Sequence, residues 1–415
     1  MDLLIRDIGT LAVVPPGPVA GAAMRDVAYV RDAALLVRGR QIAWFGAQGD
    51  CPDASGVREL SAQGGTVIPG LIDPHTHIPF VGNRAGEFVR RLAGESYLSI
   101  MQSGGGIRVT TEAVRAASVD ELVAANLPRL QRMLAQGVTT VECKSGYGLH
   151  PEHEIKQLRA IRALNEQQPI DLVPTYLGAH ALPAEFEGRR DEFVDFVASE
   201  EVLARVAGEG LARFCDVFCD AGAFTVAQTR RVLERAAKVG LRAKVHADEL
   251  EQIGASRLAG ELRAVSADHL EQIDDDGIAA LKQGGTVAVV LPGTSFYLGI
   301  EHCDARRLIE AGLPVAIATD FNPGSSMIES LPLIMSIAAC QLRLTPSEVL
   351  VGCTANAAAA LDLAGQVGAI AEGFAADLVL LDVPTLDEWF YEPGRPRVRA
   401  VVKGGKVVVL ADGAV

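Results

Sequence analysis

The sequence predicts an α/β fold, in which a (β/α)8 barrel of the TIM type carries a small β-sandwich-like domain formed from both chain termini. Three observations support this prediction. The middle of the chain contains eight apolar runs of strand length, helical patterns lie between them, and both ends are rich in short strands. We expect residues 1–66 and 362–415 to form the composite small domain and residues 67–361 to form the barrel.

The two ends of the chain share the pattern of short strands and tight turns. The amino-terminal segment reads DLLIRDIGTLAVV and then AALLVRGRQIAWFG. The carboxyl-terminal segment reads ADLVLLDV and then VRAVVKGGKVVVL, with a Gly-Gly pair at the expected turn. We expect these two ends to pair with each other as one small domain.

Eight apolar runs supply the expected barrel strands. In chain order they read VIPGLIDPHTH, TTVECKSGYG, IDLVPTYLGAH, ARFCDVFCD, LRAKVHADEL, RAVSADHLE, TVAVVLPG and PVAIATDFNPG. Among the helical segments, FTVAQTRRVLERAAKVG places Thr225 as an N-cap, Gln228 three residues on and Gly240 at the end. The segment LTPSEVL repeats the pattern with Thr345 and Glu348. Apolar strands that alternate with helices predict a closed parallel barrel with its helices outside.

Composition and charge exclude several classes of protein. The chain has 415 residues, of which 49% are hydrophobic and 22% charged, as expected for a well-packed enzyme. Its net charge of −14 argues against a nucleic-acid partner, because phosphate binding needs concentrated Lys and Arg. We also expect no membrane span and no signal peptide, since Asp2, Arg6 and Asp7 interrupt the first apolar stretch. Seven scattered cysteines are typical of reduced thiols, so we expect a cytoplasmic protein.

Polar residues gather at the carboxyl ends of the expected strands, where barrels of this kind hold their active sites. Of the 8 histidines, those at strand ends are His75, His77, His180, His246 and His269. Residues i and i+2 of a strand face the same side, so His75 and His77 can both point into the barrel mouth. Chance placement would scatter the histidines, so this bias is the strongest functional signal in the sequence.

Four strand-end residues together suit a metal ion. His75, His77 and His246 offer three nitrogens, and Asp320, at the end of the eighth expected strand, offers an oxygen. Three nitrogens and one oxygen suit zinc or ferrous iron, and a catalytic site keeps one further position for water. Any one of these histidines alone is better explained as a hydrogen-bonded core residue, but the four placements together favour a metal site.

Longer motifs resemble a known family. The stretches PGLIDPHTH, HADE, SADHLE and ATDFNPG together resemble the metal-dependent amidohydrolase superfamily. Within this superfamily, further stretches resemble one family, the imidazolonepropionases of histidine degradation. They are FVGNRAGEFVRRLAGESY, SGGGIRVT, VECKSGYGL, TYLGAHALP, DVFCDAGAF, LPGTSFYLG and ATDFNPGSS. The resemblance runs from Ile68 to Ala360 and is looser outside, where DEWFYEPGRPRV replaces the family's usual Tyr-His-Tyr-Gly stretch.

The resemblance implies an enzyme that hydrolyses a cyclic amide, opening 4-imidazolone-5-propanoate to N-formimidoyl-L-glutamate. It implies a homodimer. It implies one divalent metal, zinc or iron, bound by His75, His77, His246 and Asp320. It implies substrate contacts from Arg84, Tyr147, His180, Glu249, Asn322, Gly324 and Ser325.

The residue types fit this chemistry. Arg84 offers a planar fork for the propionate carboxylate, which an acidic protein must meet with a local cation. His269 is expected to donate a hydrogen bond to the ring amide oxygen as that oxygen gains negative charge. Asp320 is expected to bind the metal and to pass the water proton to the leaving nitrogen. Glu249 can contact the ring nitrogens or share the proton transfer, and the sequence leaves the division among these three catalytic residues open.

Lys144 bears on the number of metal ions. In some relatives a carboxylated lysine on the fourth strand bridges two metals, but the fourth expected strand here, ARFCDVFCD, has no lysine. We therefore predict a single metal. Lys144 lies on the second expected strand, where it is expected to form a salt bridge or to neutralise substrate charge.

Two other functions stay open at the level of sequence. The same metal and acid–base residues would serve a deaminase acting on a purine- or pyrimidine-like ring, although a neutral base has no carboxylate to pair with Arg84. A non-catalytic barrel would be expected to have lost metal ligands, and none is lost here. We expect a small-molecule substrate with a carboxylate, and neither nucleic acid nor membrane as a partner.

Overall fold

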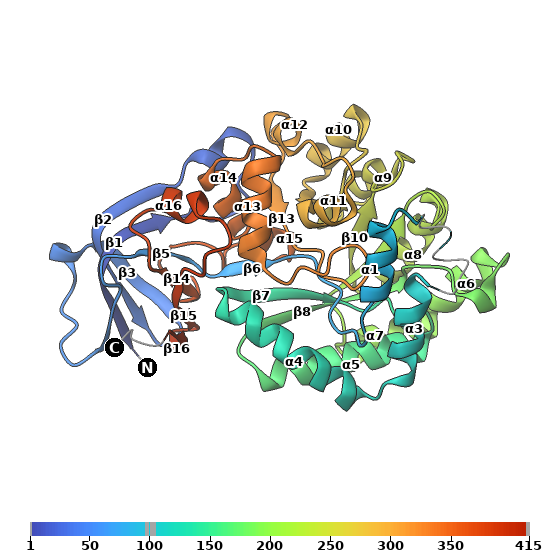
Figure 1. Cartoon of the computed structure of the whole chain (residues 1–415), viewed down its shortest axis with the longest axis horizontal. Helices are drawn as coiled ribbons and strands as arrows, with labels where there is room; N and C mark the ends of the chain where they lie inside the picture. Colours follow the sequence, from blue (N-terminus) through green and yellow to red (C-terminus); the bar gives the residue numbers. More distant parts are fainter. Residues whose placement is uncertain (1, 96–98, 100–104, 412–415) are drawn as a thin grey trace.

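Two sheets organise the chain. The computed structural model describes residues 2–95, 99 and 105–411. Figure 1 shows a small sheet, built from both ends of the chain, beside a larger barrel. The predicted α/β fold is therefore confirmed, and each of the eight expected segments contains a barrel strand. The division into two domains at residues 66/67 and 361/362 stays a prediction.

Eight parallel strands form the barrel in the order β13-β12-β11-β10-β9-β8-β7-β6. They are β6 Leu71–Asp73, β7 Val138–Lys144, β8 Asp171–Ala179, β9 Phe214–Cys219, β10 Arg242–Ala247, β11 Ser266–His269, β12 Val287–Val290 and β13 Val315–Ile317. Between β6 and β13 there is a parallel bridge from Thr76 to Phe321, and the amide of Asp320 donates to the carbonyl of His75 over 3.1 Å. The seam between the first and last strands is thus closed near their carboxyl ends.

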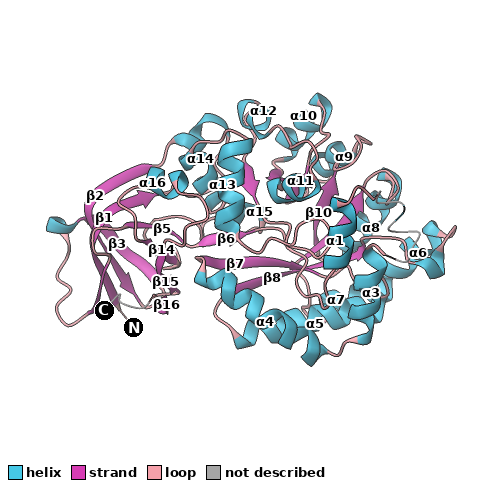
Figure 2. Ribbon diagram, in the orientation of Figure 1, coloured by secondary structure: helices cyan, strands magenta, loops and turns pink. Residues whose placement is uncertain are grey.

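Helices surround the barrel, as Figure 2 shows. They are α1 Ala85–Leu92, α3 Ile107–Ala116, α4 Val119–Ala135, α5 Pro151–Gln167, α6 Arg190–Val197, α7 Glu200–Gly208, α8 Val226–Lys238, α9 Ala255–Glu261, α10 Asp275–Gly284, α11 Pro292–Leu298, α12 Ala305–Glu310, α13 Leu331–Gln341, α14 Pro346–Gly352, α15 Ala355–Ala360 and α16 Leu386–Tyr391. The predicted capping boxes are present, since Thr225 and Gln228 cap α8 and Thr345 and Glu348 cap α14. Within the described part of the chain, no helix combines the length and apolarity of a membrane span.

The chain ends form one mixed sheet that is separate from the barrel. Its strands are β1 Leu3–Val13, β2 Ala28–Arg38, β3 Gln41–Ala47, β4 Arg58–Ser61, β5 Thr66–Pro69, β14 Leu378–Leu381, β15 Val398–Lys403 and β16 Lys406–Leu410. Strand β5 joins the two ends, because it pairs parallel with β1 and antiparallel with β14. Ile8, Leu35, Val67, Leu378 and Val402 are fully buried in the core of this sheet.

The expected first barrel strand, VIPGLIDPHTH, proved to be wrong as a single element. It is two short strands in different sheets, with β5 in the terminal sheet and β6 in the barrel. Gly70 lies between them, and a Cβ atom there would lie 2.3 Å from Oγ1 of Thr139. The backbone therefore crosses between the sheets at a point too close to β7 for any side chain, and His75 and His77 follow β6 instead of lying on it.

Glu348, in the first turn of α14, connects this helix to α12 and to a short 3₁₀ helix near the amino end of the chain. Its buried carboxylate accepts two hydrogen bonds from Arg306 of α12, at 2.6 and 2.7 Å, and one from Arg25 at 2.9 Å. Arg25 ends the short 3₁₀ helix η1, Gly21–Arg25. Burial alone would raise the pKa of Glu348, but hydrogen bonds from Arg306, the Thr345 backbone and Arg25 lower the pKa to about 2.

We predict that Glu348→Gln lowers the free energy of unfolding by about 1.5–3 kcal/mol at pH 7, because it removes the charge from these hydrogen bonds. A depressed pKa stabilises the fold above the unfolded value of 4.5, and this contribution is lost as the pH falls towards about 2. Thermal unfolding of both proteins between pH 7 and pH 3 measures the difference. If the difference in the free energy of unfolding between the two proteins stays constant from pH 7 to pH 3, the ionised Glu348 carboxylate does not make the predicted contribution.

Candidate active site

A cavity of about 610 Å³ opens at the carboxyl ends of the barrel strands. Among the predicted site residues, those that line it are His77, Arg84, Tyr147, His180, His246, Glu249, His269, Asp320, Asn322, Gly324 and Ser325. His75 is fully buried next to this lining and contacts His77. The structure therefore brings together all the residues that the sequence had placed in one site.

Four side chains converge at the floor of the cavity. The Nε2 atom of His77 lies 3.3 Å from Nε2 of His75 and 3.5 Å from Nε2 of His246. Oδ1 of Asp320 lies 3.2 Å from Nε2 of His77 and 3.4 Å from Nε2 of His75. All four side chains are at most 3% exposed. Nε2 of His75, Nε2 of His77 and Oδ1 of Asp320 thus lie within 3.2–3.4 Å of one another, and Nε2 of His246 lies beside this group, next to His77.

This spacing fits a metal ion. Donor atoms that each lie about 2.0–2.1 Å from a tetrahedral zinc are about 3.3–3.4 Å from one another. The separations of 3.2–3.5 Å match this value. Oδ1 of Asp320 has no hydrogen-bond partner among the described residues, although it is buried. Since a buried carboxylate oxygen without a partner is costly, the donor set suits a cation at its centre.

The outward-facing nitrogens of two of these histidines lie beside carboxylates, and the contact at His75 is a hydrogen bond. Nδ1 of His75 lies 2.7 Å from Oδ2 of Asp268, and Nδ1 of His246 lies 2.9 Å from Oδ2 of Asp216. These contacts leave the Nε2 atoms of both rings free to face His77. Burial lowers the pKa of His77 and of His246, which favours the neutral imidazole that binds metals. Burial and the charge of Lys144 would lower the pKa of His75, but the carboxylates of Asp268 and Asp320 outweigh them and raise it.

Asp320 has a fixed side chain and an unusual backbone conformation. Its Oδ2 accepts a hydrogen bond from Oγ1 of Thr294 at 2.6 Å, which fixes the carboxylate plane and leaves Oδ1 towards the histidines. Its backbone is in the left-handed region, with φ of 52°. Such strained backbone at a cavity floor is typical of functional residues.

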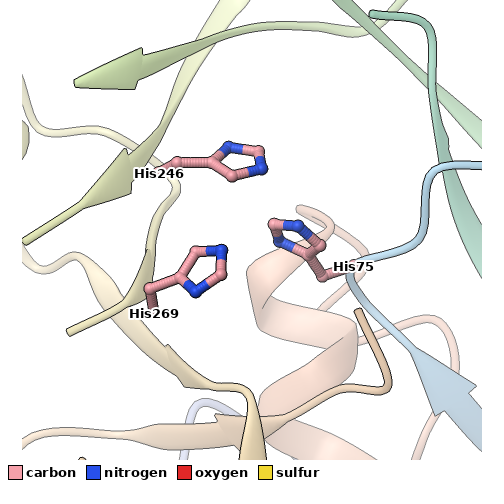
Figure 3. A group of neighbouring side chains, drawn as sticks. All are labelled: His75, His246 and His269. Carbon is pink, nitrogen blue, oxygen red and sulfur yellow. The ribbon is translucent and has the colours of Figure 1, made fainter. Parts of the chain in front are cut away.

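His269 lies between two acidic residues at the side of this cluster, and Figure 3 shows its ring beside those of His75 and His246. Its Nε2 lies 3.5 Å from Glu249 and its Nδ1 lies 3.7 Å from Glu271. Burial alone would lower the pKa of His269, but the charges of Glu249 and Glu271 raise it to about 9. In the metal-free protein the two acidic neighbours therefore favour the protonated form of His269, which can donate a hydrogen bond into the cavity.

The KSGYG loop after β7 places Tyr147 and His180 on one wall. Oε1 of Gln157 accepts hydrogen bonds from the amides of Tyr147 and Gly148, at 3.1 and 2.9 Å. Nδ1 of His180 lies 2.8 Å from the carbonyl oxygen of Gly146, so the ring donates its Nδ1 proton and turns Nε2 outward. Burial lowers the pKa of His180 to about 3, so this ring is neutral at any physiological pH.

Arg84 is already paired within the cavity. Its Nε and Nη2 atoms donate to Oε2 of Glu87 at 2.9 and 2.7 Å, and both side chains are mostly buried. Its Nη1 atom lies beside Gly324, where an added Cβ atom would be only 2.5 Å away. Glycine at position 324 is thus required for the guanidinium to lie across this loop.

Asn322 holds the loop that carries Gly324 and Ser325. Its Oδ1 accepts hydrogen bonds from both of these amides at 2.8 Å, and its Nδ2 donates to the carbonyl of Asp320 at 2.7 Å. The hydroxyl of Ser325 lies 3.4 Å from Oδ2 of Asp320. Asn322 therefore fixes the wall next to the donor cluster.

Sequence reasoning missed several residues that line the cavity. Glu87, Phe88 and Arg91 lie on α1, and Tyr297 lies on α11. The Phe88 and Tyr297 rings stack with centroids 4.9 Å apart, and Arg91 lies 5.2 Å from the Tyr297 ring centre. The i,i+3 spacing of Arg84 and Glu87 was a signal for their pairing, but the contact between α1 and α11 had no local signal.

Of the two roles expected for Lys144, the structure shows the salt bridge. Its Nζ lies 2.8 Å from Asp216 and 2.9 Å from Glu142, and its side chain is fully buried. It does not belong to the described lining of the cavity, so it makes no contact there with a substrate. The unusual tail helix α16 is likewise outside this lining.

The chain is similar to known proteins over nearly its whole length. A model described as "Amidohydrolase family" matches residues 66–408, so the chain is a member of that family. An imidazolonepropionase from Shouchella clausii is 46% identical over 97% of this chain and 91% of its own length. Another from Caldanaerobacter subterraneus is 46% identical over 99% of both chains. Within the amidohydrolases, the chain belongs to the imidazolonepropionase family.

Solved structures with similar folds are more distant. An adenosine deaminase from Xanthomonas campestris, solved with bound zinc, superposes with a TM-score of 0.73 and covers 99% of this chain and 93% of its own. Its sequence is only 20% identical, so the similarity shows a common fold and does not favour the deaminase alternative.

We predict that His269 in the metal-free protein stays protonated at pH 8 and titrates near pH 9. A raised pKa means that protonation stabilises the fold fully below 6.5, and this stabilisation is lost as the pH rises through about 9. NMR of the protein with labelled histidine measures the midpoint. Glu249→Gln should lower it, and a neutral His269 at pH 8 in the unaltered protein would refute the assignment.

Proposed function

We propose that this protein opens the ring of 4-imidazolone-5-propanoate by hydrolysis and releases N-formimidoyl-L-glutamate, as part of histidine degradation. One observation carries the proposal: the donor cluster of His75, His77, His246 and Asp320 lies in the same cavity as Arg84. The site thus offers a place for hydrolysis beside a cation that suits a carboxylate. The family relationship supports the same substrate.

The metal that we propose is a single zinc or ferrous ion, held by His75, His77, His246 and Asp320. Such an ion would lower the pKa of a water molecule towards about 7 and polarise the amide carbonyl. The neutral imidazoles and the ionised carboxylate are the forms that ligands must take, and the lowered pKa of Asp320 is consistent with this. Burial alone would raise the pKa of Asp320, but the adjacent imidazoles of His75 and His77 lower it.

The proton transfers and the charge stabilisation are assigned to three residues. Asp320 accepts the proton of the attacking water and passes it to the ring nitrogen that leaves. His269 donates a hydrogen bond to the amide oxygen as that oxygen gains negative charge. Glu249, whose pKa is raised by burial, faces His269 and contacts the ring nitrogens of the substrate.

The wall of the cavity orients the propionate. Because Glu87 already accepts from Nε and Nη2 of Arg84, the substrate carboxylate meets the guanidinium at Nη1, next to Gly324 and Ser325. Tyr147 and the Ser325 hydroxyl add neutral hydrogen bonds. His180, with Nε2 turned outward, contacts the ring of the substrate.

The first experiment is an assay of purified, metal-analysed protein with freshly generated 4-imidazolone-5-propanoate, guanine and cytosine. Turnover of the imidazolone alone supports the proposal. Turnover of guanine or cytosine instead would replace it with the deaminase alternative. The expected homodimer and cytoplasmic location stay predictions.

His246→Ala should lose both metal and activity, because it removes one of the four proposed donors. We expect the metal content to fall from about one ion per chain to near zero. His153→Ala is the matched control, since His153 lies on α5 outside the described cavity lining and should keep both properties. Full metal content in His246→Ala would remove this residue from the ligand set.

Arg84→Ala should raise KM about 10- to 150-fold with a smaller effect on kcat, from the loss of a charge-assisted hydrogen bond of about 1.5–3 kcal/mol. Since this change also leaves Glu87 without its cation, the double variant Arg84→Ala/Glu87→Gln separates the two effects, and its KM should stay raised. Arg90→Ala, on the same helix but paired with Glu95, is the control. A KM equal to that of the control would exclude Arg84 from substrate binding.

A further inference from the structure

Beneath the donor cluster lies a group of charged residues that the proposed reaction does not use. We call it the buried ion cluster, and its members are Glu142, Lys144, Asp216, Lys244 and Asp268. All five side chains are 0% exposed. They come from β7, β9, β10 and β11, so four barrel strands contribute to it. None belongs to the described lining of the cavity.

The members of the buried ion cluster contact one another directly. Nζ of Lys144 lies 2.8 Å from Asp216 and 2.9 Å from Glu142, and Nζ of Lys244 lies 2.9 Å from the same Glu142 oxygen. The two ammonium groups also lie 3.6 and 3.7 Å from Oδ2 of Asp268. Three carboxylates therefore share two cations out of contact with water.

Two of these carboxylates are the ones that contact the proposed metal ligands. Oδ2 of Asp268 lies 2.7 Å from Nδ1 of His75, and its Oδ1 accepts from Ser266 at 2.5 Å. Oδ2 of Asp216 lies 2.9 Å from Nδ1 of His246, and its Oδ1 accepts from the His246 amide at 3.2 Å. Each carboxylate is thus held at both oxygens, with one oxygen towards an imidazole.

Lys244 has a further contact with the ligand segment. Its Nζ donates to the carbonyl oxygen of Pro74 at 3.0 Å, one residue before His75. It also lies two residues before His246 on β10, so both side chains point to the same side of that strand. Lys244 therefore couples the segment after β6 to β10.

We propose that Lys144 and Lys244 are positioning residues for metal binding, because they fix Asp216 and Asp268 and through them the orientation of His246 and His75. This inference rests on the ligand set proposed above. A carboxylate removed from water needs a cation nearby, and an imidazole whose Nδ1–H is held by that carboxylate presents Nε2 to the metal. The lysines thus affect metal binding through Asp216 and Asp268 and do not contact the ion themselves.

The same geometry accounts for a single metal. His75, Glu142 and Asp268 lie close enough together to hold a cation themselves. The ammonium groups of Lys144 and Lys244 supply positive charge to two of these three residues. Two lysines therefore take the place that a second ion would have among these carboxylates.

The test compares Lys144→Met and Lys244→Met with Lys403→Met. Lys403 forms ion pairs with Asp377 at 2.7 Å and with Asp171, at the start of β8, at 2.6 Å. It contacts no member of the buried ion cluster in these pairs, so it reports on the loss of a buried charge elsewhere in the fold. Zinc affinity is measured on the metal-free proteins by competition with a coloured chelator. The absorption spectrum of the cobalt-substituted proteins reports on ligand geometry, and KM and kcat are measured on the zinc forms.

We expect both cluster variants to bind zinc about 10- to 100-fold more weakly, with an altered cobalt spectrum and a lower kcat at unchanged KM. Lys403→Met should lose thermal stability but keep its zinc affinity and cobalt spectrum. Unchanged affinity and spectrum in the cluster variants would overturn the inference. If they do not fold, Asp268→Asn, which keeps the size of the side chain, is measured in the same way and must show the same losses.

The unaltered protein distinguishes this inference from the proposed function. If it binds no stoichiometric metal, the proposed ligand set fails and the role of the lysines fails with it. If it binds metal and hydrolyses the imidazolone while the variants bind metal equally well, only the inference on Lys144 and Lys244 fails.

Discussion

The pairing of charges inside the barrel is the constraint on which the site depends. Barrels of this type usually fill their interior with branched aliphatic side chains. Here Lys144 and Lys244 lie inside with three carboxylates, and each cation contacts Glu142 within 3 Å. Removing one partner from a buried ion pair typically costs about 3–5 kcal/mol, so the strands must keep the positions that maintain these contacts. The positions of His75 and His246 follow from the same contacts.

The walls of the cavity are built on another pattern, in which a buried polar side chain holds each functional loop by its backbone. Gln157 holds the loop of Tyr147, and Asn322 holds the loop of Gly324. Asp220 holds the loop after β10, where it accepts from the amide of Glu249 at 2.7 Å. Loops are ordinarily the mobile parts of a barrel. These contacts give the substrate-facing residues fixed positions without placing them on strands.

The sequence predicted the donor cluster because its members follow strands whose ends meet at one rim of a barrel. His75, His77 and Asp320 come from the first and last strands, yet strand order alone brings them together. The break at Gly70 was not predicted, since it depends on the approach of Thr139 from another strand. The same limit applies to the buried ion cluster, because the partners of Lys144 depend on the register between strands that are distant in sequence. Glu87, Phe88, Arg91 and Tyr297 were not identified from the sequence, because their place in the cavity depends on the contact between α1 and α11.

The seam of the barrel has a consequence for how the protein matures. His75 and His77 lie on one side of that seam and Asp320 on the other, and the described bridge between the two sides is short. An ion bound by all three residues would link the first and last strands of the barrel across the seam. A nascent chain that has not yet delivered its eighth strand has only part of the donor set, however well its earlier strands have folded. With the proposed ligand set, a chain that ends before Asp320 would lack one of the four metal ligands.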